Sequence, residues 1–262
     1  MTAAPRAELG VFGGSGLYAL LDDGDDVEID TPYGPTSAPL RIGEVGGRRV
    51  AFLPRHGVGH EHPPHRVPYR ANVWALHALG VRQVVAPCAV GSLRADLGPT
   101  TFVIPDQLVD RTSGRDGTFF DGPTTFHAAL ADPYCDHLRA EALAACRAEG
   151  VTVEDGGTVT VVSGPRFSTR AESRWFASMG TDLLNMTQAP EAALCREAGL
   201  CYAAIALVTD YDVGLDGTDL PPVTQTEVFA LFDATIPVLR RILLRLLSDA
   251  GQPCGLEAGP GF

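Results

Sequence analysis

The chain has 262 residues, of which 45% are hydrophobic and 20% charged, so it can bury a full core within one domain. Its 32 acidic residues against 20 Lys and Arg give a formal net charge of -12, which opposes binding to nucleic-acid phosphates or anionic lipid. No stretch reaches the ~18 uninterrupted apolar residues of a membrane span, and no apolar signal-peptide core is present near the start. We therefore expect a cytoplasmic protein that binds a small molecule, and neither nucleic acid nor a membrane.

Short apolar runs alternate along the chain with segments of helical periodicity. Strands are predicted at residues 9–12, 27–30, 40–42, 50–53, 83–87, 101–104, 158–162 and 202–208. Helices are predicted at residues 69–78, 134–149, 171–179, 190–198 and 224–249, with a kink or break at Pro237 in the last one. This alternation predicts an α/β fold with one mixed, largely parallel sheet flanked by helices.

The domain is expected to cover residues 1–250, and the Gly- and Pro-rich segment 251–262 is expected to be a disordered tail. The two long polar loops, 57–68 and 111–132, are typical of lids or binding segments.

The six cysteines contain no CxxC pair and lie in apolar or helical surroundings, which favours reduced core thiols over disulfides. The histidines 60, 62 and 65 share a loop with two prolines and lack a nearby Cys or second acidic group, so no metal site is predicted there.

Two predicted strands end in residues suited to an anion. The first runs into Gly13 and Gly14, where backbone N–H groups can approach a ligand and Ser15 adds a hydroxyl donor. Another ends before Arg55 and His56, which offer a planar fork of donors and a further ring donor. Open α/β sheets bind ligands beyond the carboxyl ends of their strands, so these groups are candidates for one site. An ordinary Gly-rich turn and a surface ion pair remain the structural alternatives.

Three other segments supply further candidates. Small residues at Cys88 and Ala89 leave room for a ligand to contact backbone. Met186 and Thr187 precede a predicted helix. Thr187 is suited to donate to an anion or simply to cap the helix. Met186, taken alone, would be interpreted as a core residue. Phe167 follows a strand and could stack on a purine, although an aromatic residue there is more often core.

The acidic pair Asp210 and Asp212 closes the apolar run at residues 202–208, which reads as a buried strand. A protonated carboxyl group donates to one atom of a ligand and accepts from another, and adenine offers that pair with N7 and the 6-amino group. The alternative for these residues is helix or turn capping.

Seven ordered segments carry a resemblance to a known family. GVFGGSGL, PRHG, PYRANVWA, GSLR, GPRFSTRAES, NMTQAPEAALCREAGLCYA and VTDYD resemble the purine nucleoside phosphorylase superfamily, and within it the 5′-methylthioadenosine phosphorylases. The resemblance runs from Gly10 to about Asp212 and implies phosphorolysis of a 5′-deoxy-5′-substituted adenosine to adenine and a ribose 1-phosphate. Inorganic phosphate would be a co-substrate, and no cofactor or metal is implied.

The resemblance also implies residue roles. The phosphate would be held by the residues Ser15, Arg55, His56, Ala89 and Thr187, with Cys88 at a position where these enzymes usually have the stronger donor Thr. Phe167 and Ser168 would contact the base, and Met186 would contact the ribose. Val228 and Phe229 would form the wall of the pocket for the 5′ group, together with Val223. Gln225 could extend into that pocket. Asp210 and Asp212 would address the N7 and 6-amino edge, which requires burial to raise the pKa of Asp210. His127 would reach the 5′ group of a neighbouring subunit in a homotrimer.

Relatives that cleave 6-oxopurines have Asn at the position of Asp210 and Glu at that of Ser168, so adenine is favoured here. Three alternatives remain open: a phosphorylase for 6-oxopurine nucleosides or 5′-methylthioinosine, a nucleosidase that uses water, and a non-catalytic purine-binding protein.

Overall fold

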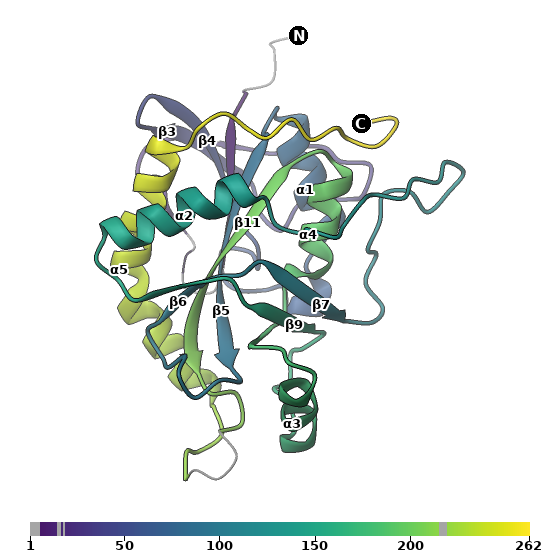
Figure 1. Cartoon of the computed structure of the whole chain (residues 1–262). Helices are drawn as coiled ribbons and strands as arrows, with labels where there is room; N and C mark the ends of the chain where they lie inside the picture. The colour runs from purple at the N-terminus through teal and green to yellow at the C-terminus, as the bar shows by residue number, and fades with distance from the viewer. Residues whose placement is uncertain (1–5, 15–16, 18, 215–218) are drawn as a thin grey trace.

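The computed structural model describes residues 6–14, 17, 19–214 and 219–262, which form one large sheet with helices on both faces (Figure 1). The strands are β1 Leu9–Gly13, β2 Asp25–Val27, β3 Leu40–Val45, β4 Arg48–Pro54, β5 Gln83–Ser92, β6 Phe102–Ile104, β7 Gln107–Arg111, β8 Val153–Asp155, β9 Thr158–Val162, β10 Leu183–Asn185 and β11 Cys201–Asp210. The helices are α1 Tyr69–Ala78, α2 Asp136–Ala148, α3 Arg170–Ser178, α4 Gln188–Glu197 and α5 Gln225–Asp249, with a short 3-10 turn at Pro64–Arg66.

Strand β5 organises the sheet. It pairs in parallel with β1 and β11 and antiparallel with β10, while β4 runs parallel to β1 on the far side. The carboxyl ends of β1, β4, β5 and β11 therefore meet at one edge of the sheet. In an open α/β sheet this is the edge where a ligand binds.

The core has a layer on each face of the sheet. Helices α1 and α4 pack together and contribute to one apolar cluster, whereas α2 and α5 pack together and contribute to the other (Figure 1). Strand β11 is buried along almost its whole length because both faces are covered. That burial explains its continuous apolar sequence.

The expected mixed α/β domain is confirmed, with differences in detail. Helix α1 has the predicted bounds, and the other helices begin and end within about two residues of the prediction. The short strands β7, β8 and β10 were not predicted, and β2 lies at Asp25–Val27 instead of 27–30. Helix α5 continues through Pro237 without a break. No helix in the described part of the chain is long and apolar enough to span a bilayer.

The C-terminal segment differs from the expected disorder. It folds back over the domain, where the Gly259 N–H donates to the Glu197 carbonyl at 2.8 Å and the Phe262 ring packs 4.8 Å from that of Phe119. Cys254 in this segment forms a disulfide with Cys201 of β11, so the prediction of reduced thiols was wrong for this pair. The pairing joins cysteines 53 residues apart, and only the return of the tail brings them together.

Candidate active site

A cavity of about 340 Å³ lies at the carboxyl ends of the central strands. It brings together predicted site residues from widely separated segments: Arg55, His56, Cys88, Ala89, Phe167, Ser168, Met186, Thr187, Asp210, Asp212, Val228 and Phe229. Ser15 lies outside the described residues. His127 is exposed and does not line the cavity of its own chain, and neither does Val223.

Arg55 is held by a buried ion pair. Its Nε and Nη2 donate to the two carboxylate oxygens of Glu191 at 2.6 and 2.8 Å, and its Nη1 donates to the Pro87 carbonyl at 3.3 Å. Both side chains are only 1% exposed. Burial opposes the charge of Arg55, but the carboxylate of Glu191 outweighs it and raises the pKa of Arg55 above its usual value. The surface ion pair considered from the sequence is thus a buried one, at the wall of the cavity.

His56 is neutral in this setting. Burial and the neighbouring charge of Arg55 lower the pKa of His56 to about 3. Its Nδ1 lies 2.8 Å from the carbonyl oxygen of His62 and therefore carries the hydrogen and donates to it. The ring stacks on His60 with 4.5 Å between centroids. Because Nε2 of this tautomer is an acceptor, the only donor that His56 can offer an anion is its backbone N–H.

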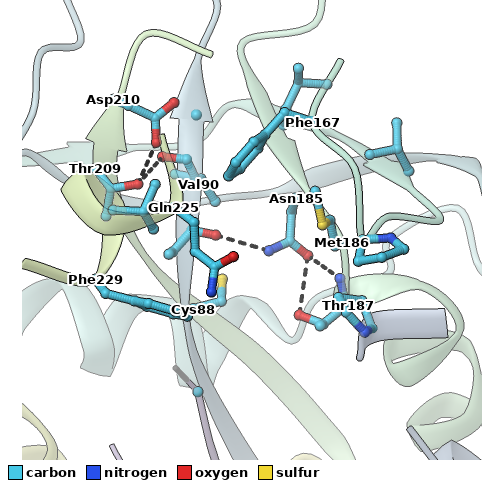
Figure 2. Close-up of a pocket in the computed structure, with 18 of the residues that line it drawn as sticks. Cys88, Val90, Phe167, Asn185, Met186, Thr187, Thr209, Asp210, Gln225 and Phe229 are labelled. Carbon is cyan, nitrogen blue, oxygen red and sulfur yellow. Dashed lines mark hydrogen bonds between the residues drawn. The ribbon is translucent and has the colours of Figure 1, made fainter. Parts of the chain in front are cut away.

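The turn between β10 and α4 is organised by Asn185. Its Oδ1 accepts from the backbone N–H groups of Thr187 and Gln188 at 2.7 and 2.8 Å, and its Nδ2 donates to the Ala89 carbonyl at 3.1 Å. Figure 2 shows the contact between Asn185 and Thr187. Thr187 makes no side-chain cap to α4, and its hydroxyl lies 3.3 Å from the same Oδ1. The amide of Asn185 therefore joins this turn to β5, so Thr187 and Ala89 line the same cavity.

The carboxylates of Asp210 and Asp212 lie at the purine end proposed below. Thr209 Oγ1 donates to Asp210 Oδ2, and the backbone N–H of Asp212 donates to Asp210 Oδ1, each at 2.7 Å. Burial raises the pKa of Asp210 to about 6, although these two hydrogen bonds oppose the shift. Burial also raises the pKa of Asp212, against hydrogen bonds from Ser173 and Ser168. Asp210 can therefore exchange a proton near neutral pH.

The backbone at this end is irregular. A β-bulge interrupts the register of β11 and β5 between Val208 and Asp210, and places Asp210 opposite Gly91. Asp212 has φ of 52°, a left-handed conformation that costs a non-glycine residue energy and is common at functional sites. Its Oδ2 is buried without a hydrogen-bond partner among the described residues. Both observations favour a ligand for Asp212 over a capping role.

The remaining walls are largely apolar. Figure 2 shows Phe167 and Met186 on one side of the cavity and Phe229 on the other, with Gln225 between them. The rings of His60 and Phe229 pack edge to face, with 5.5 Å between their centroids. The Gln225 side chain is exposed and makes no hydrogen bond within the described part of the structure, so this wall combines apolar surface with one polar group that is open to solvent.

Several site residues were missed from the sequence. Besides Gly14, which the sequence did indicate, the cavity is also lined by His60, Pro63, Pro64, Val90, Gly91, Val162, Pro165, Leu184, Asn185 and Thr209. Behind it, Glu191 and Gln188 contact lining residues without being exposed themselves. The sequence did contain a signal for Glu191, since a buried helix start with an acidic residue needs a cationic partner. Among the described residues, the histidines of the 57–68 loop are not part of a group of three close potential ligands; the group that is found, Cys135, Cys201 and Cys254, contains the disulfide pair.

Comparison with known proteins agrees with this geometry. Residues 8–248 match the model of the phosphorylase superfamily. The chain is 58% identical over 241 residues to S-methyl-5′-thioadenosine phosphorylase of Mycolicibacterium smegmatis, which covers 91% of this chain and 90% of that protein. It is 51% identical over 268 residues to a purine nucleoside phosphorylase of Streptomyces coelicolor, covering 97% and 95%.

A solved structure, methylthioadenosine phosphorylase of Schistosoma mansoni in complex with adenine, is similar with a TM-score of 0.88 and 37% identity over 93% of this chain and 91% of that one. The family match spans nearly the whole chain and includes every element that lines the cavity. This chain belongs to the phosphorylase superfamily.

Proposed function

We propose that this enzyme is a pentosyltransferase that cleaves 5′-methylthioadenosine, or a related 5′-deoxy-5′-substituted adenosine, with inorganic phosphate. The products are adenine and the 5-substituted ribose 1-phosphate. The observation that carries the proposal is one cavity that has a cationic, donor-rich end at Arg55 and Thr187 and an end with two ionisable carboxyl groups, Asp210 and Asp212, of which Asp210 can donate a proton. A nucleoside whose base lies at the second end presents its anomeric carbon to an anion at the first.

The chemistry follows from where charge develops. Cleavage of the glycosidic bond makes the sugar positive and the departing purine negative. A phosphate held by Arg55, Thr187, the thiol of Cys88 and the backbone of His56 and Ala89 stabilises the sugar and attacks its anomeric carbon. Ser15 is assigned to the same anion by sequence alone. The site needs phosphate as co-substrate and no other cofactor.

At the other end, Asp210 donates a proton or a hydrogen bond to N7, and the carboxyl oxygens of Asp210 and Asp212 accept from the 6-amino group. A buried carboxyl group with a pKa of about 6 is partly protonated near neutral pH and can fill this role. Phe167 stacks on the base beside Ser168, and Met186 packs on the ribose. Val228 and Phe229 form the apolar part of the wall for the 5′ group.

The direct test is adenine release from 5′-methylthioadenosine with and without phosphate. Release that requires phosphate, with formation of a sugar phosphate, supports the proposal. Release without phosphate would identify a nucleosidase, and tight adenine binding without turnover would identify a purine-binding protein.

A second candidate, a phosphorylase for 6-oxopurine nucleosides or 5′-methylthioinosine, is favoured by the likeness to the purine nucleoside phosphorylase of Streptomyces coelicolor. Against it stand the carboxylate of Asp210 and the hydroxyl of Ser168, where an amide and a longer acid would suit O6 and N1–H. Comparing kcat/KM for methylthioadenosine, methylthioinosine, adenosine and inosine decides between the two.

The assembly proposed is a cytoplasmic homotrimer, in which His127 of the partner subunit reaches the 5′ group. His127 is exposed and lies away from the cavity of its own chain, as this arrangement requires. Light scattering tests the oligomeric state. His127→Ala should raise KM for the nucleoside without changing the molar mass.

A further inference from the structure

The start of α4 carries two buried polar residues that line no part of the cavity surface, Gln188 and Glu191. Each touches a side chain that does line it. Glu191 holds Arg55, and Gln188 Nε2 donates to Cys88 Sγ at 3.2 Å. The two contacts are thus made to Arg55 and Cys88, the side chains whose hydrogens are available to an anion in the cavity.

Two tyrosines stand behind the pair. The Tyr202 hydroxyl donates to Glu191 Oε1 at 2.8 Å, and the Tyr134 hydroxyl donates to Gln188 Oε1. The two rings stack with 5.9 Å between centroids and 24° between planes. Burial raises the pKa of both phenols well above the usual value, so each keeps its hydrogen and acts as a donor.

The Glu191 branch fixes the guanidinium of Arg55. Of its five N–H groups, two donate to Glu191 and one to the Pro87 carbonyl. One hydrogen on each terminal nitrogen is left, and Arg55 lines the cavity. Because the bidentate pair sets the plane of the fork, it also sets the direction of these two remaining donors.

The contact with Gln188 determines whether the Cys88 thiol donates or accepts toward the cavity. Since the Tyr134 hydroxyl donates to Oε1 of Gln188, the Nε2 group faces Cys88 and donates to its sulfur. Burial raises the pKa of Cys88 to about 11, so the thiol keeps its hydrogen. With the sulfur already accepting, the S–H is the group left to point at a ligand.

We infer that Gln188 and Glu191 are positioning residues that fix the donors of the phosphate subsite, each backed by one of the stacked tyrosines. The inference rests on the proposed function, because it names phosphate as the anion. It also explains how a thiol serves at a donor position: the amide of Gln188 makes Cys88 a donor instead of leaving its hydrogen free to turn away.

The test uses isosteric variants and inorganic phosphate as the probe. In Glu191→Gln, one carboxylate oxygen becomes an NH2 group that cannot accept from Arg55. In Gln188→Glu, both oxygens accept, so the Cys88 hydrogen turns toward the new carboxylate. We expect KM for phosphate to rise about 10- to 100-fold in each, the value of one charged hydrogen bond, with KM for the nucleoside changed less than about threefold. Tyr202→Phe and Tyr134→Phe should give smaller rises in the same constant.

The matched control is Glu197→Gln on the same helix. The Glu197 carboxylate is also buried and accepts from Thr118 Oγ1 and the Phe119 N–H, both at 2.7 Å, but neither of these partners lines the cavity. This variant should lose thermal stability and keep the wild-type KM for phosphate. Each variant is also heated with phosphate alone and with adenine alone. The phosphate-induced rise in Tm should disappear in Glu191→Gln and Gln188→Glu, and the adenine-induced rise should remain.

An unchanged KM for phosphate with an unchanged phosphate-induced Tm rise in both variants would overturn the inference. So would an equal loss of the phosphate and adenine responses, because that pattern indicates a purely structural role. Failure of the proposed function looks different: the wild-type protein would then release adenine without phosphate or not at all.

Discussion

The two ends of the cavity are built on opposite principles. At the anion end, the charge of Arg55 is already paired with Glu191 and three of its five N–H groups are already bonded. At the purine end, burial raises the pKa of Asp210 to about 6, and one carboxylate oxygen of Asp212 has no hydrogen-bond partner among the described residues. The first end is prearranged to hold a fixed charge, whereas the second is arranged to take up or release a proton. This division suits a reaction in which a phosphate anion attacks the sugar and the negative charge of the departing purine is neutralised by a proton.

The largest effect should come from removing the proton donor at the purine end. Asp210→Asn keeps the size of the side chain but cannot transfer a proton. We expect kcat/KM for adenine nucleosides to fall about 10²- to 10⁴-fold, the usual contribution of a general acid. For inosine analogues the loss should be far smaller, because an amide can donate to O6. Steady-state kinetics on both bases checks this; equal losses would mean that Asp210 does not read the 6-position.

The next effect concerns the paired charge at the anion end. Arg55→Met leaves Glu191 as a buried carboxylate without its cation, and should lower the free energy of unfolding by about 3–5 kcal/mol. The double variant Arg55→Met with Glu191→Leu removes both charges. It should regain most of the stability, yet remain unable to use phosphate. Chemical denaturation and phosphate kinetics measure the two properties separately, and a double variant as unstable as the single one would contradict this account.

A smaller effect is expected from pH. The protonated form of Asp210 predominates below its pKa of about 6, so activity that requires this proton should fall as the pH rises above that value. At saturating phosphate, kcat/KM for the nucleoside should decline about tenfold per pH unit on that limb. The measurement is a pH profile from 5 to about 9. Asp210→Asn should lack the limb, and a profile with the same limb in both proteins would assign it to another group.

The smallest effect should come from replacing Gln225, the polar residue in the otherwise apolar wall beside Phe229. Gln225→Leu replaces an amide that has no partner among the described residues with apolar surface of similar length. We expect the ratio of kcat/KM for methylthioadenosine over adenosine to rise about two- to tenfold, the scale of one small apolar contact. Kinetics with the two nucleosides gives the ratio. An unchanged ratio would place the 5′ group elsewhere in the cavity.

Much of the site could be predicted because polar residues at the ends of parallel strands share one edge of a sheet. Arg55 follows β4 and Asp210 ends β11, while Cys88 lies in the second half of β5, which runs beyond its predicted end; all three line the same cavity. The β-bulge at Asp210 was not predictable, since register depends on the neighbouring strand. The role of His127 remains a prediction, because it depends on a second copy of the chain.

The residues that support the site were harder to find than those that line it. Asn185, Gln188 and Glu191 occur where helix-capping residues are common, and nothing in their spacing shows what they contact. Their partners Ala89, Cys88 and Arg55 lie 96, 100 and 136 residues earlier. The disulfide of the tail was missed for the same reason.

Gly91 limits how this pocket can change during evolution. A methyl group at this position would lie 2.9 Å from Asp210 Oδ1 and 3.3 Å from the Asp212 Cα. A side chain at this position would displace the Asp210 carboxylate and crowd the Cα and Cβ of Asp212. New base preferences in descendants of this protein must therefore arise by exchanging side chains such as Asp210 or Ser168, while the glycine facing them stays the same.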